Sequence, residues 1–313
     1  MNNFLGIDTS NYTTSIAAYN AGNNSIVQAK QLLSVSKNSI GLRQSDAVFA
    51  HVKNLPDLFY KLKDNIKDIK AIGVSTRPRN TDGSYMPCFT VGTGCAKQLS
   101  VVLNIPIHKF SHQQGHIAAA LYSANKLPFL QSQFIAFHVS GGTTESLLVN
   151  PDKEQIMSID IIAASLDLKA GQAIDRIGVM LGFDFPAGAE LDKLALKSNK
   201  EFKVTPALKN FDCCLSGLQN LCKNMYINNS SPEDIAKYCF TYLSKTFEIM
   251  CEKIILKYGD LPVVFAGGVM SNTIIRKHLS QKFNAFFASP EYSCDNAAGI
   301  AILSKLKEDR LNL

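Results

Sequence analysis

The stretch that decides the fold reads FLGIDTSNYTT, at residues 4–14, because its pattern returns later in the chain. The second copy, FIAFHVSGGTT at residues 134–144, aligns with the first without gaps at an offset of 130 residues. Each copy reads as an apolar strand, a tight turn rich in Ser, Thr, Gly or Asn, and a second strand, which is the pattern of a β-hairpin. Two such hairpins, each followed by alternating helices and strands, predict a duplicated α/β domain.

The segments after each hairpin alternate between helical and extended patterns, and residues 76–87 form a long polar loop. Ser231 before Pro232 is typical of a helix start. We predict helices over residues 46–66, 90–103, 170–181 and 189–196, and from Ser231, Ser271 and Asp295 onward. We predict strands over residues 69–75, 105–110, 155–162, 262–266 and 285–289. The first domain is expected over residues 1–110, completed by a C-terminal helix over residues 295–313, and the second over residues 111–294.

The composition predicts a folded protein of about two domains. The 313 residues are 46% hydrophobic and 19% charged, which excludes wholesale disorder, and no stretch of about 18 apolar residues predicts a membrane span. The N-terminal residues lack the basic and apolar regions of a signal peptide, and the eight cysteines contain no C-x-x-C pair. We therefore expect a cytoplasmic protein with reduced thiols, no membrane contact and no structural zinc cluster.

The positive charge is concentrated in the first third of the chain. The net charge is +6, from 32 Lys and Arg against 26 Asp and Glu. Residues 1–110 hold twelve of these basic residues and six of the acidic ones, with the highest density over residues 53–79. Such a basic face suits an RNA or a phosphate-rich partner. An ordinary solvated helix face gives the same pattern, so the charge alone leaves both interpretations open.

The turns of the two hairpins are candidate phosphate-binding sites. Thr9, Ser10 and Asn11 in the first turn, and residues 140–143 in the second, offer hydroxyl groups and closely approachable backbone N–H groups, which phosphate oxygens require. Two such turns facing each other across a cleft would hold one nucleotide from both sides, although each alone is also an ordinary hairpin turn. A third turn, AGGVMSN from residue 266, ends a strand and opens a helix, and Asn272 in it is a candidate to bond a base or ribose.

The segment SHQQGH, which begins at residue 111, contains two histidines with metal-ligand spacing. His112 and His116 are at positions i and i+4, which share one face of a helix. A two-histidine site needs a further ligand, usually a carboxylate, and Asp295 is our candidate. Gln113 stands where a zincin protease has its catalytic glutamate, which disfavours that class. Two histidines that cap or pack within a helix would show the same spacing, so the sequence leaves this alternative open.

Together these segments resemble the tRNA N6-threonylcarbamoyladenosine transferase family, once described as sialoglycoprotein endopeptidases. That family belongs to the superfamily of actin, hexokinase and the heat-shock ATPases, which have duplicated ribonuclease-H-like domains with a nucleotide cleft between them. The resemblance runs nearly end to end and rests on motifs in the family's order. These are GIDTS at residues 6–10, AHV at 50–52, His112 and His116, VSGG at 139–142, Gly171 and Asp175, FPAGAELDKL at 185–194, LSGL at 215–218, GGVMSN at 267–272 and CDNAA at 294–298.

The resemblance implies an acyltransferase that moves a threonylcarbamoyl group from threonylcarbamoyl-AMP to N6 of the adenosine 3′-adjacent to the tRNA anticodon. It implies one divalent metal ion, iron or zinc, held by His112, His116 and Asp295, with ATP or the adenylate as ligand and Mg²⁺ as a further candidate ion. The nucleotide-binding residues that it implies are Thr9, Ser10, Val139, Ser140, Gly141, Gly142, Thr143, Asp175, Gly188, Asp192, Gly268 and Asn272. It also implies tRNA as a partner, held by the basic N-terminal third, and two partner subunits, an actin-like paralogue and a small ATPase.

The sequence departs from the family's pattern at several polar positions. NYTT at residues 11–14 replaces a Cys and paired carboxylates, Asp8 replaces a longer Glu, and a longer basic loop at residues 76–85 replaces Gly-Pro-Gly. Thr143, Gln219 and Gln172 replace a His, a Lys and a Glu. These changes indicate a divergent bacterial paralogue and keep two alternatives open. One is a catalytically reduced nucleotide-binding scaffold or regulator of a tRNA-modification complex, and the other is a metalloprotease, which only the paired histidines support.

Overall fold

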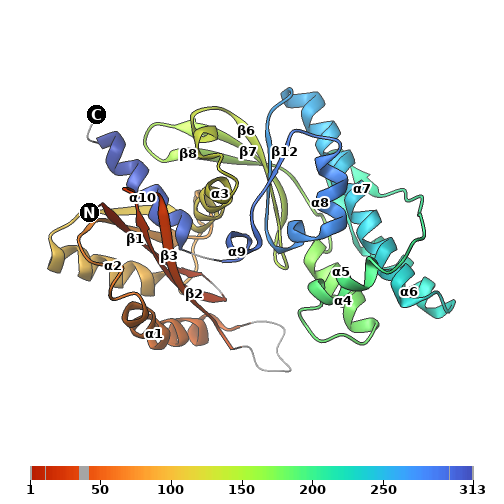
Figure 1. Ribbon diagram of the computed structural model, residues 1–313, viewed down its shortest axis with the longest axis horizontal. Coiled ribbons are helices and arrows are strands. Elements are labelled where there is room, and N and C mark those ends of the chain that lie inside the picture. The colour runs from red at the N-terminus through yellow and green to blue at the C-terminus, as the bar shows by residue number, and fades with distance from the viewer. Residues whose placement is uncertain (1, 11, 35–41, 296, 312–313) are drawn as a thin grey trace. The chain divides into compact units, whose positions relative to one another are not determined.

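The computed structural model of the chain describes residues 2–10, 12–34, 42–295 and 297–311 (Figure 1). These residues form two compact units. The first lies within Met1–Leu130, Pro151–Ser158 and Cys294–Leu313, and the second within Gln131–Asn150 and Ile159–Ser293. Each unit is built on one five-stranded sheet.

The sheet of the first unit begins with the predicted hairpin. Its strands are β1 (Asn3–Ser10), β2 (Thr13–Asn20), β3 (Ser25–Leu32), β4 (Ile69–Arg77) and β5 (Ile107–Ser111), in the order β3-β2-β1-β4-β5. The first three strands form an antiparallel meander, and β4 and β5 continue the sheet in parallel with β1. All eight residues of the central strand β1 are buried, so both faces of the sheet are covered at this point.

The sheet of the second unit repeats this plan. Its strands are β6 (Phe134–Val139), β7 (Thr144–Asp152), β8 (Ile156–Ala164), β11 (Val263–Ala266) and β12 (Ala285–Phe287), in the order β12-β11-β6-β7-β8. The hairpin β6–β7 is antiparallel, and β11 and β12 run parallel to β6. Read in the direction β8-β7-β6-β11-β12, this order matches the order β3-β2-β1-β4-β5 of the first sheet strand for strand. The shared order confirms the predicted duplicated α/β fold.

Helices cover both faces of the first sheet, because successive side chains of β1 point to opposite sides. Ile7 and Thr9 contact α2 at Gly92, whereas Gly6 faces α10. Buried leucine, isoleucine and valine side chains fill the core beneath α1 and α2. The helices of this unit are α1 (Gln44–Lys61), α2 (Phe89–Leu103), α3 (His112–Ser123) and α10 (Ala298–Leu311).

The second unit has the larger apolar core, which includes Phe137, Phe247 and Phe265. Its longest helix, α7, has the predicted start, since the Ser231 side chain accepts a hydrogen bond from the Asp234 backbone N–H and proline follows the cap. The helices are α4 (Ala170–Met180), α5 (Gly188–Ala195), α6 (Ser216–Ile227), α7 (Pro232–Tyr258), α8 (Thr273–Ser280) and α9 (Pro290–Ser293). This unit also has a small ribbon of β9 (Ala207–Lys209) and β10 (Asp212–Cys214) and the 3-10 turn η2 (Gly268–Ser271), whereas the 3-10 turn η1 (Leu127–Gln131) falls almost wholly in the first unit.

Several boundaries differ from the sequence-based prediction. The helix expected over residues 46–66 runs through Pro56 and ends at Lys61. The helix expected from Asp295 begins at Ala298. We did not predict β3, a half-exposed edge strand without a clear alternation, or α6. The first unit also extends beyond the predicted boundary at residue 110 and takes in α3, because α3 packs against the C-terminal helix α10.

Among the described residues, no helix has the length and apolar character needed to cross a bilayer. All eight cysteines are free thiols, and five of them are buried.

The packing of α10 depends on glycines at its contacts. A Cβ atom on Gly6 of β1 would lie 2.3 Å from the Ala297 carbonyl oxygen, and one on Gly73 of β4 would lie 2.4 Å from that of Ile300. A Cβ on Gly299 would lie only 1.8 Å from the carbonyl oxygen of Gly115 on α3. Because backbone meets backbone at these points, the helix can occupy this position only without side chains there.

We expect Gly299→Ala to lower the free energy of unfolding by about 3 kcal/mol, since the added methyl group must displace the α3 backbone. The matched control is Gly94→Ala in α2, where a Cβ has no heavy atom within 4 Å. This control should instead gain roughly 0.5–1 kcal/mol from helix propensity. Urea unfolding followed by circular dichroism measures both. Equal stability of Gly299→Ala and the wild type would contradict the close-contact explanation.

Candidate functional site

The first candidate site lies at the N-terminal end of α3. The Ser111 hydroxyl accepts a hydrogen bond from the Gln114 backbone N–H at 3.2 Å, and Gln114 Oε1 accepts one from the Ser111 N–H at 2.8 Å. This reciprocal capping box fixes the first turn of the helix. His112 and His116 therefore lie one turn apart on a well-anchored helix, as the i, i+4 spacing predicted.

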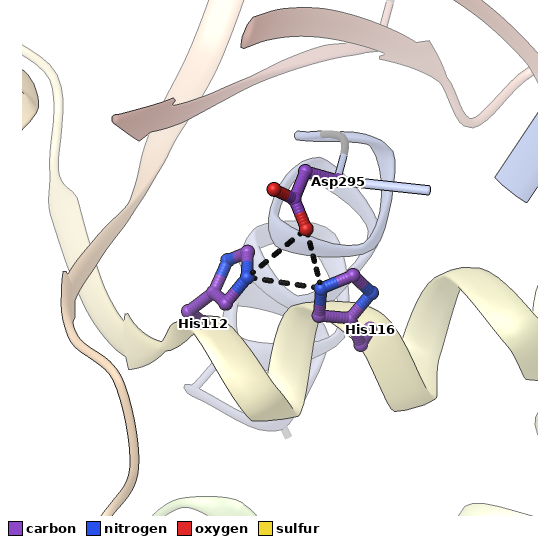
Figure 2. Close-up of side chains that lie close together, drawn as sticks. All are labelled: His112, His116 and Asp295. Atoms are coloured by element: carbon purple, nitrogen blue, oxygen red, sulfur yellow. Dashed lines mark hydrogen bonds and ion pairs between the residues drawn. The ribbon is translucent and has the colours of Figure 1, made fainter. Parts of the chain in front are cut away.

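Asp295 meets the two histidines, so the structure brings the predicted triad together (Figure 2). His112 Nε2 lies 2.9 Å from His116 Nε2. Asp295 Oδ1 lies 3.1 Å from His116 Nε2 and 3.5 Å from His112 Nε2. Three potential ligand atoms from two separate segments thus converge on one point.

The carboxylate of Asp8 contacts His112 at Nδ1, the ring nitrogen that does not face Asp295. Asp8 Oδ2 is 2.6 Å from His112 Nδ1, while Asp8 Oδ1 accepts a hydrogen bond from the Ser10 N–H at 2.9 Å. Because Asp8 engages Nδ1, the other ring nitrogen of His112, Nε2, faces His116 and Asp295. Burial lowers the pKa of His112, but the charge of Asp8 and the hydrogen bonds to Asp295 and Asp8 outweigh it and raise the pKa to about 10.

Asp295 lies in the loop between α9 and α10, three residues before α10 begins. Burial raises the pKa of this carboxyl, but hydrogen bonds from His112 and His116 hold the pKa well below its usual range. The Thr13 hydroxyl donates a further hydrogen bond to Asp295 Oδ2 at 3.4 Å. The carboxylate is therefore kept ionised, which is the form that binds a cation.

The described polar groups of the first hairpin hold the unit together internally. The Thr9 hydroxyl donates to the Cys88 carbonyl oxygen at 2.9 Å and accepts from the Gly92 N–H at 3.1 Å, which ties β1 to α2. Ser10 is buried beside it, and Asn11 lies outside the described residues. On α1, His51 is buried with its Nδ1 2.8 Å from the Thr14 hydroxyl.

The second candidate site is the turn between β6 and β7. The Ser140 N–H donates to the Thr143 carbonyl oxygen at 2.7 Å, and the Thr143 N–H donates to Ser140 Oγ at 3.2 Å. Gly141 and Gly142 between them are exposed. A Cβ on Gly171 of α4 would lie 2.6 Å from Gly141 Cα, so the N-terminal end of α4 packs directly against this turn. A helix N-terminus next to exposed glycine amides is a favourable environment for an anion.

The residues predicted for the ribose and base form two further groups in the second unit. Asp192 accepts hydrogen bonds from Asn272 Nδ2 at 2.7 Å and from the Thr273 hydroxyl at 2.9 Å. Asn272 Oδ1 caps α8 by accepting from the Ile275 N–H at 2.9 Å. Gly268, at the start of η2, is exposed and follows Gly267, whose positive φ of 97° and contact with the Val139 carbonyl oxygen need glycine.

Asp175 and Gly188 form the second of these two groups. Asp175 accepts a hydrogen bond from the Ala187 N–H at 2.9 Å, directly before Gly188, the first residue of α5. Burial raises the pKa of Asp175.

Asp8 was not predicted as a site residue from the sequence, although Asp stands there in place of a Glu. An acidic residue near the end of the apolar first strand of this hairpin was the available signal. The capping pattern Ser111-x-x-Gln114 was a second unused signal, because it predicts that a helix starts at His112.

The fold defines the general class of the protein. The chain is similar in structure to component A of the (R)-2-hydroxyglutaryl-CoA dehydratase of Acidaminococcus fermentans, with 14% identity, a TM-score of 0.57 and coverage of 99% of this chain and 100% of that one. It is also similar to a ROK family glucokinase from Streptomyces griseus, with 10% identity, a TM-score of 0.53 and coverage of 97% and 99%. At these identities the likeness concerns the fold alone, and it extends over nearly the whole chain.

The sequence comparison narrows this class to one family. The chain matches the tRNA N6-adenosine threonylcarbamoyltransferase family over residues 32–302. Relatives with that name from Thermosipho africanus (strain TCF52B) and Mycoplasma capricolum subsp. capricolum are each 32% identical to it. The alignments cover 95% of this chain and 92% of the first relative, and 77% and 76% for the second. The chain therefore belongs to the tRNA N6-adenosine threonylcarbamoyltransferase family, as its motifs indicated.

Removing the negative charge behind His112 should lower the pKa of its ring. For Asp8→Asn in the presence of a chelator, we expect the pKa to fall from about 10 by at least about one pH unit, because an adjacent carboxylate favours the protonated ring. Histidine side-chain NMR spectra recorded against pH measure this. The control Asp57→Asn changes an exposed carboxyl on α1 and should leave the pKa of His112 as it is. An unchanged pKa in Asp8→Asn would contradict the assigned pairing.

Proposed function

We propose that the protein is an acyltransferase that moves a threonylcarbamoyl group from threonylcarbamoyl-AMP to N6 of the adenosine 3′-adjacent to the anticodon in tRNA. The observation that carries this proposal is the convergence of His112, His116 and Asp295, backed by Asp8, in a chain of this family. In the reaction, a bond forms between N6 and the carbamoyl carbon. The bond from that carbon to the phosphate oxygen of AMP breaks, and one proton leaves N6.

The donor set of the triad fits a divalent metal ion. Ligand atoms about 2.1 Å from a tetrahedral ion lie roughly 3.4 Å apart, and the three atoms here are separated by 2.9, 3.1 and 3.5 Å. Two imidazoles and one carboxylate suit zinc and iron equally well. An ion bound there would supply a Lewis acid for the carbamoyl or phosphate oxygens.

The neighbouring residues of the chain would prepare this centre. Asp8 holds the His112 ring in the tautomer that presents Nε2, and the Ser10 N–H in turn holds Asp8. Such carboxylate partners commonly raise metal affinity by roughly 10–100-fold. Thr13 steadies the second oxygen of Asp295.

The exposed turn of the second unit would receive the phosphate of the adenylate. The amides of Gly141 and Gly142 and the hydroxyl of Ser140 are the expected donors, with Val139 and Thr143 shaping the turn. Asp175, Gly188, Asp192, Gly268 and Asn272 are the expected contacts of ribose and base. Mg²⁺ prefers oxygen ligands, so it would accompany the phosphates of ATP rather than bind at the histidines.

Metal binding and transfer test the proposal together. We expect about one zinc or iron ion per chain in the wild type and a strong loss in His116→Ala, measured by elemental analysis after dialysis. The same variant should lose formation of threonylcarbamoyladenosine in tRNA supplied with threonylcarbamoyl-AMP, by at least roughly a hundredfold. The assay includes the proposed partner subunits, an actin-like paralogue and a small ATPase, in the neutral, reducing buffer of the expected cytoplasmic setting. A wild type without metal and without transfer under these conditions overturns the proposal.

The scaffold alternative predicts a different combination of results. A paralogue that retains its nucleotide site but has lost catalysis would bind ATP and form a stable complex with the partner subunits, yet would give no modified adenosine. The loss of paired carboxylates at residues 11–14, where Thr13 now contacts Asp295, is the observation that favours this alternative.

A substitution in the phosphate turn tests the nucleotide site separately. Gly142 is exposed, and a Cβ there meets no heavy atom within 4 Å, so Gly142→Val should fold normally. Its side chain would occupy the space of a phosphate and remove at least one hydrogen bond to a charged group. Such a bond contributes about 1.5–3 kcal/mol, so ATP affinity should fall roughly ten- to a hundredfold. Calorimetric titration with ATP measures the change, and thermal unfolding provides the folding control.

A further inference from the structure

The first unit has a polar cavity whose lining includes none of the three triad residues, His112, His116 and Asp295. It has a volume of about 450 Å³ and lies between the end of β4, the first turns of α2 and the strand β5. Its lining includes Thr76, Arg77, Thr90, Thr93, Lys97 and Lys109. We call this cavity the β4–α2 pocket.

The pocket gathers positive charge without a matching negative charge. Arg77, Lys97 and Lys109 come from three different elements, and none of the residues that line the pocket is acidic. Lys97 and Lys109 are exposed, and neither forms an ion pair with any residue that the structure describes. Uncompensated cations that converge on one cavity favour an anionic ligand.

Arg77 is the anchored member of the three. Its guanidinium group donates to the Thr76 hydroxyl at 3.4 Å and to the Asn80 side-chain oxygen. These bonds use two of its five N–H donors, which leaves a rigid planar fork for a further acceptor. A fork of this kind matches two oxygens of one phosphate.

The hydroxyl groups of the two α2 threonines that line the pocket are already engaged by nearby backbone carbonyl oxygens. The hydroxyl of Thr90 donates to the Pro87 carbonyl oxygen at 2.6 Å, and that of Thr93 to the Phe89 carbonyl oxygen at 2.8 Å. The Thr90 N–H also donates to Pro87. Binding would therefore come from the three cations, whose attraction to phosphate depends on charge and salt and not on base sequence.

The lining also argues against a free nucleotide as the ligand. Threonine, arginine, lysine and glycine make up the described lining, with no aromatic or large apolar side chain on which a base could stack. A phosphate that is part of a longer chain needs no such surface at this point. The adjacent loop at residues 76–85 adds Arg79 to the same end of the sheet.

We propose that the β4–α2 pocket binds a backbone phosphate of the RNA substrate. This inference rests on the proposed function, because it assigns one anchoring contact to the tRNA of that reaction. Arg77 and the two lysines fix the position of the RNA backbone, and they do not read its sequence.

The test is tRNA binding by the full-length protein, measured by fluorescence anisotropy with a labelled tRNA transcript between about 50 and 200 mM salt. We expect the double variant Lys97→Gln/Lys109→Gln to bind roughly three- to tenfold more weakly, with the slope of log K against log salt reduced by about one. The matched control Lys197→Gln/Lys223→Gln removes two exposed charges from the second unit and should bind as the wild type does. Both variants should unfold within about 0.5 kcal/mol of the wild type, since they change only exposed side chains.

The outcomes separate this inference from the proposed function. If the wild type binds tRNA and the pocket variant binds equally well with the same salt slope, the pocket inference is wrong while the transferase proposal stands. If the pocket variant keeps its tRNA affinity but binds inorganic phosphate more weakly than the wild type does, the ligand of the pocket is a free phosphate and the RNA assignment is wrong. If the wild type does not bind tRNA at all, the pocket inference fails, and the metal and transfer assays then decide the proposed function on their own.

Discussion

The close approach of α10 to its neighbours is the constraint on which the first unit depends. Glycines at positions 6, 73 and 299 leave room for backbone to meet backbone, and Gly115 leaves room for the Ile300 side chain, so α10 lies directly on β1, β4 and α3. The loop that precedes α10 carries Asp295, and α3 carries both histidines. The last segment of the chain is thereby held against a helix almost two hundred residues earlier, and this contact brings Asp295 to His112 and His116.

Electrostatics make the triad suited to a cation. Two carboxylates and two imidazoles share a poorly solvated region, and burying charges is costly unless they are paired. The Asp8–His112 pair meets this requirement on one side by a short hydrogen bond. On the other side, Asp295 stays ionised through its bonds with the two histidines. The donor atoms of His112, His116 and Asp295 thereby converge, with separations of 2.9, 3.1 and 3.5 Å.

Much of this organisation was predictable from local patterns. The repeated hairpins at residues 4–14 and 134–144 predicted the duplication, because alternation and turn composition are local properties. The i, i+4 spacing predicted that His112 and His116 share a helix face. The edge strand β3 was missed since its half-exposed side chains follow no clear alternation. Asp8 was missed because its role comes from a partner 104 residues away, and no local pattern records such a pairing.

The sequence by itself determined the family, the duplicated α/β plan and two of the three triad residues, and it named Asp295 as the candidate for the third. Only the tertiary structure decided that Asp295 reaches the histidines, that Asp8 orients His112, and that Arg77, Lys97 and Lys109 surround one cavity. The physical reason is that strand and helix formation follow from neighbours in the chain. Convergence of distant side chains depends instead on how glycine contacts and buried faces let whole elements pack.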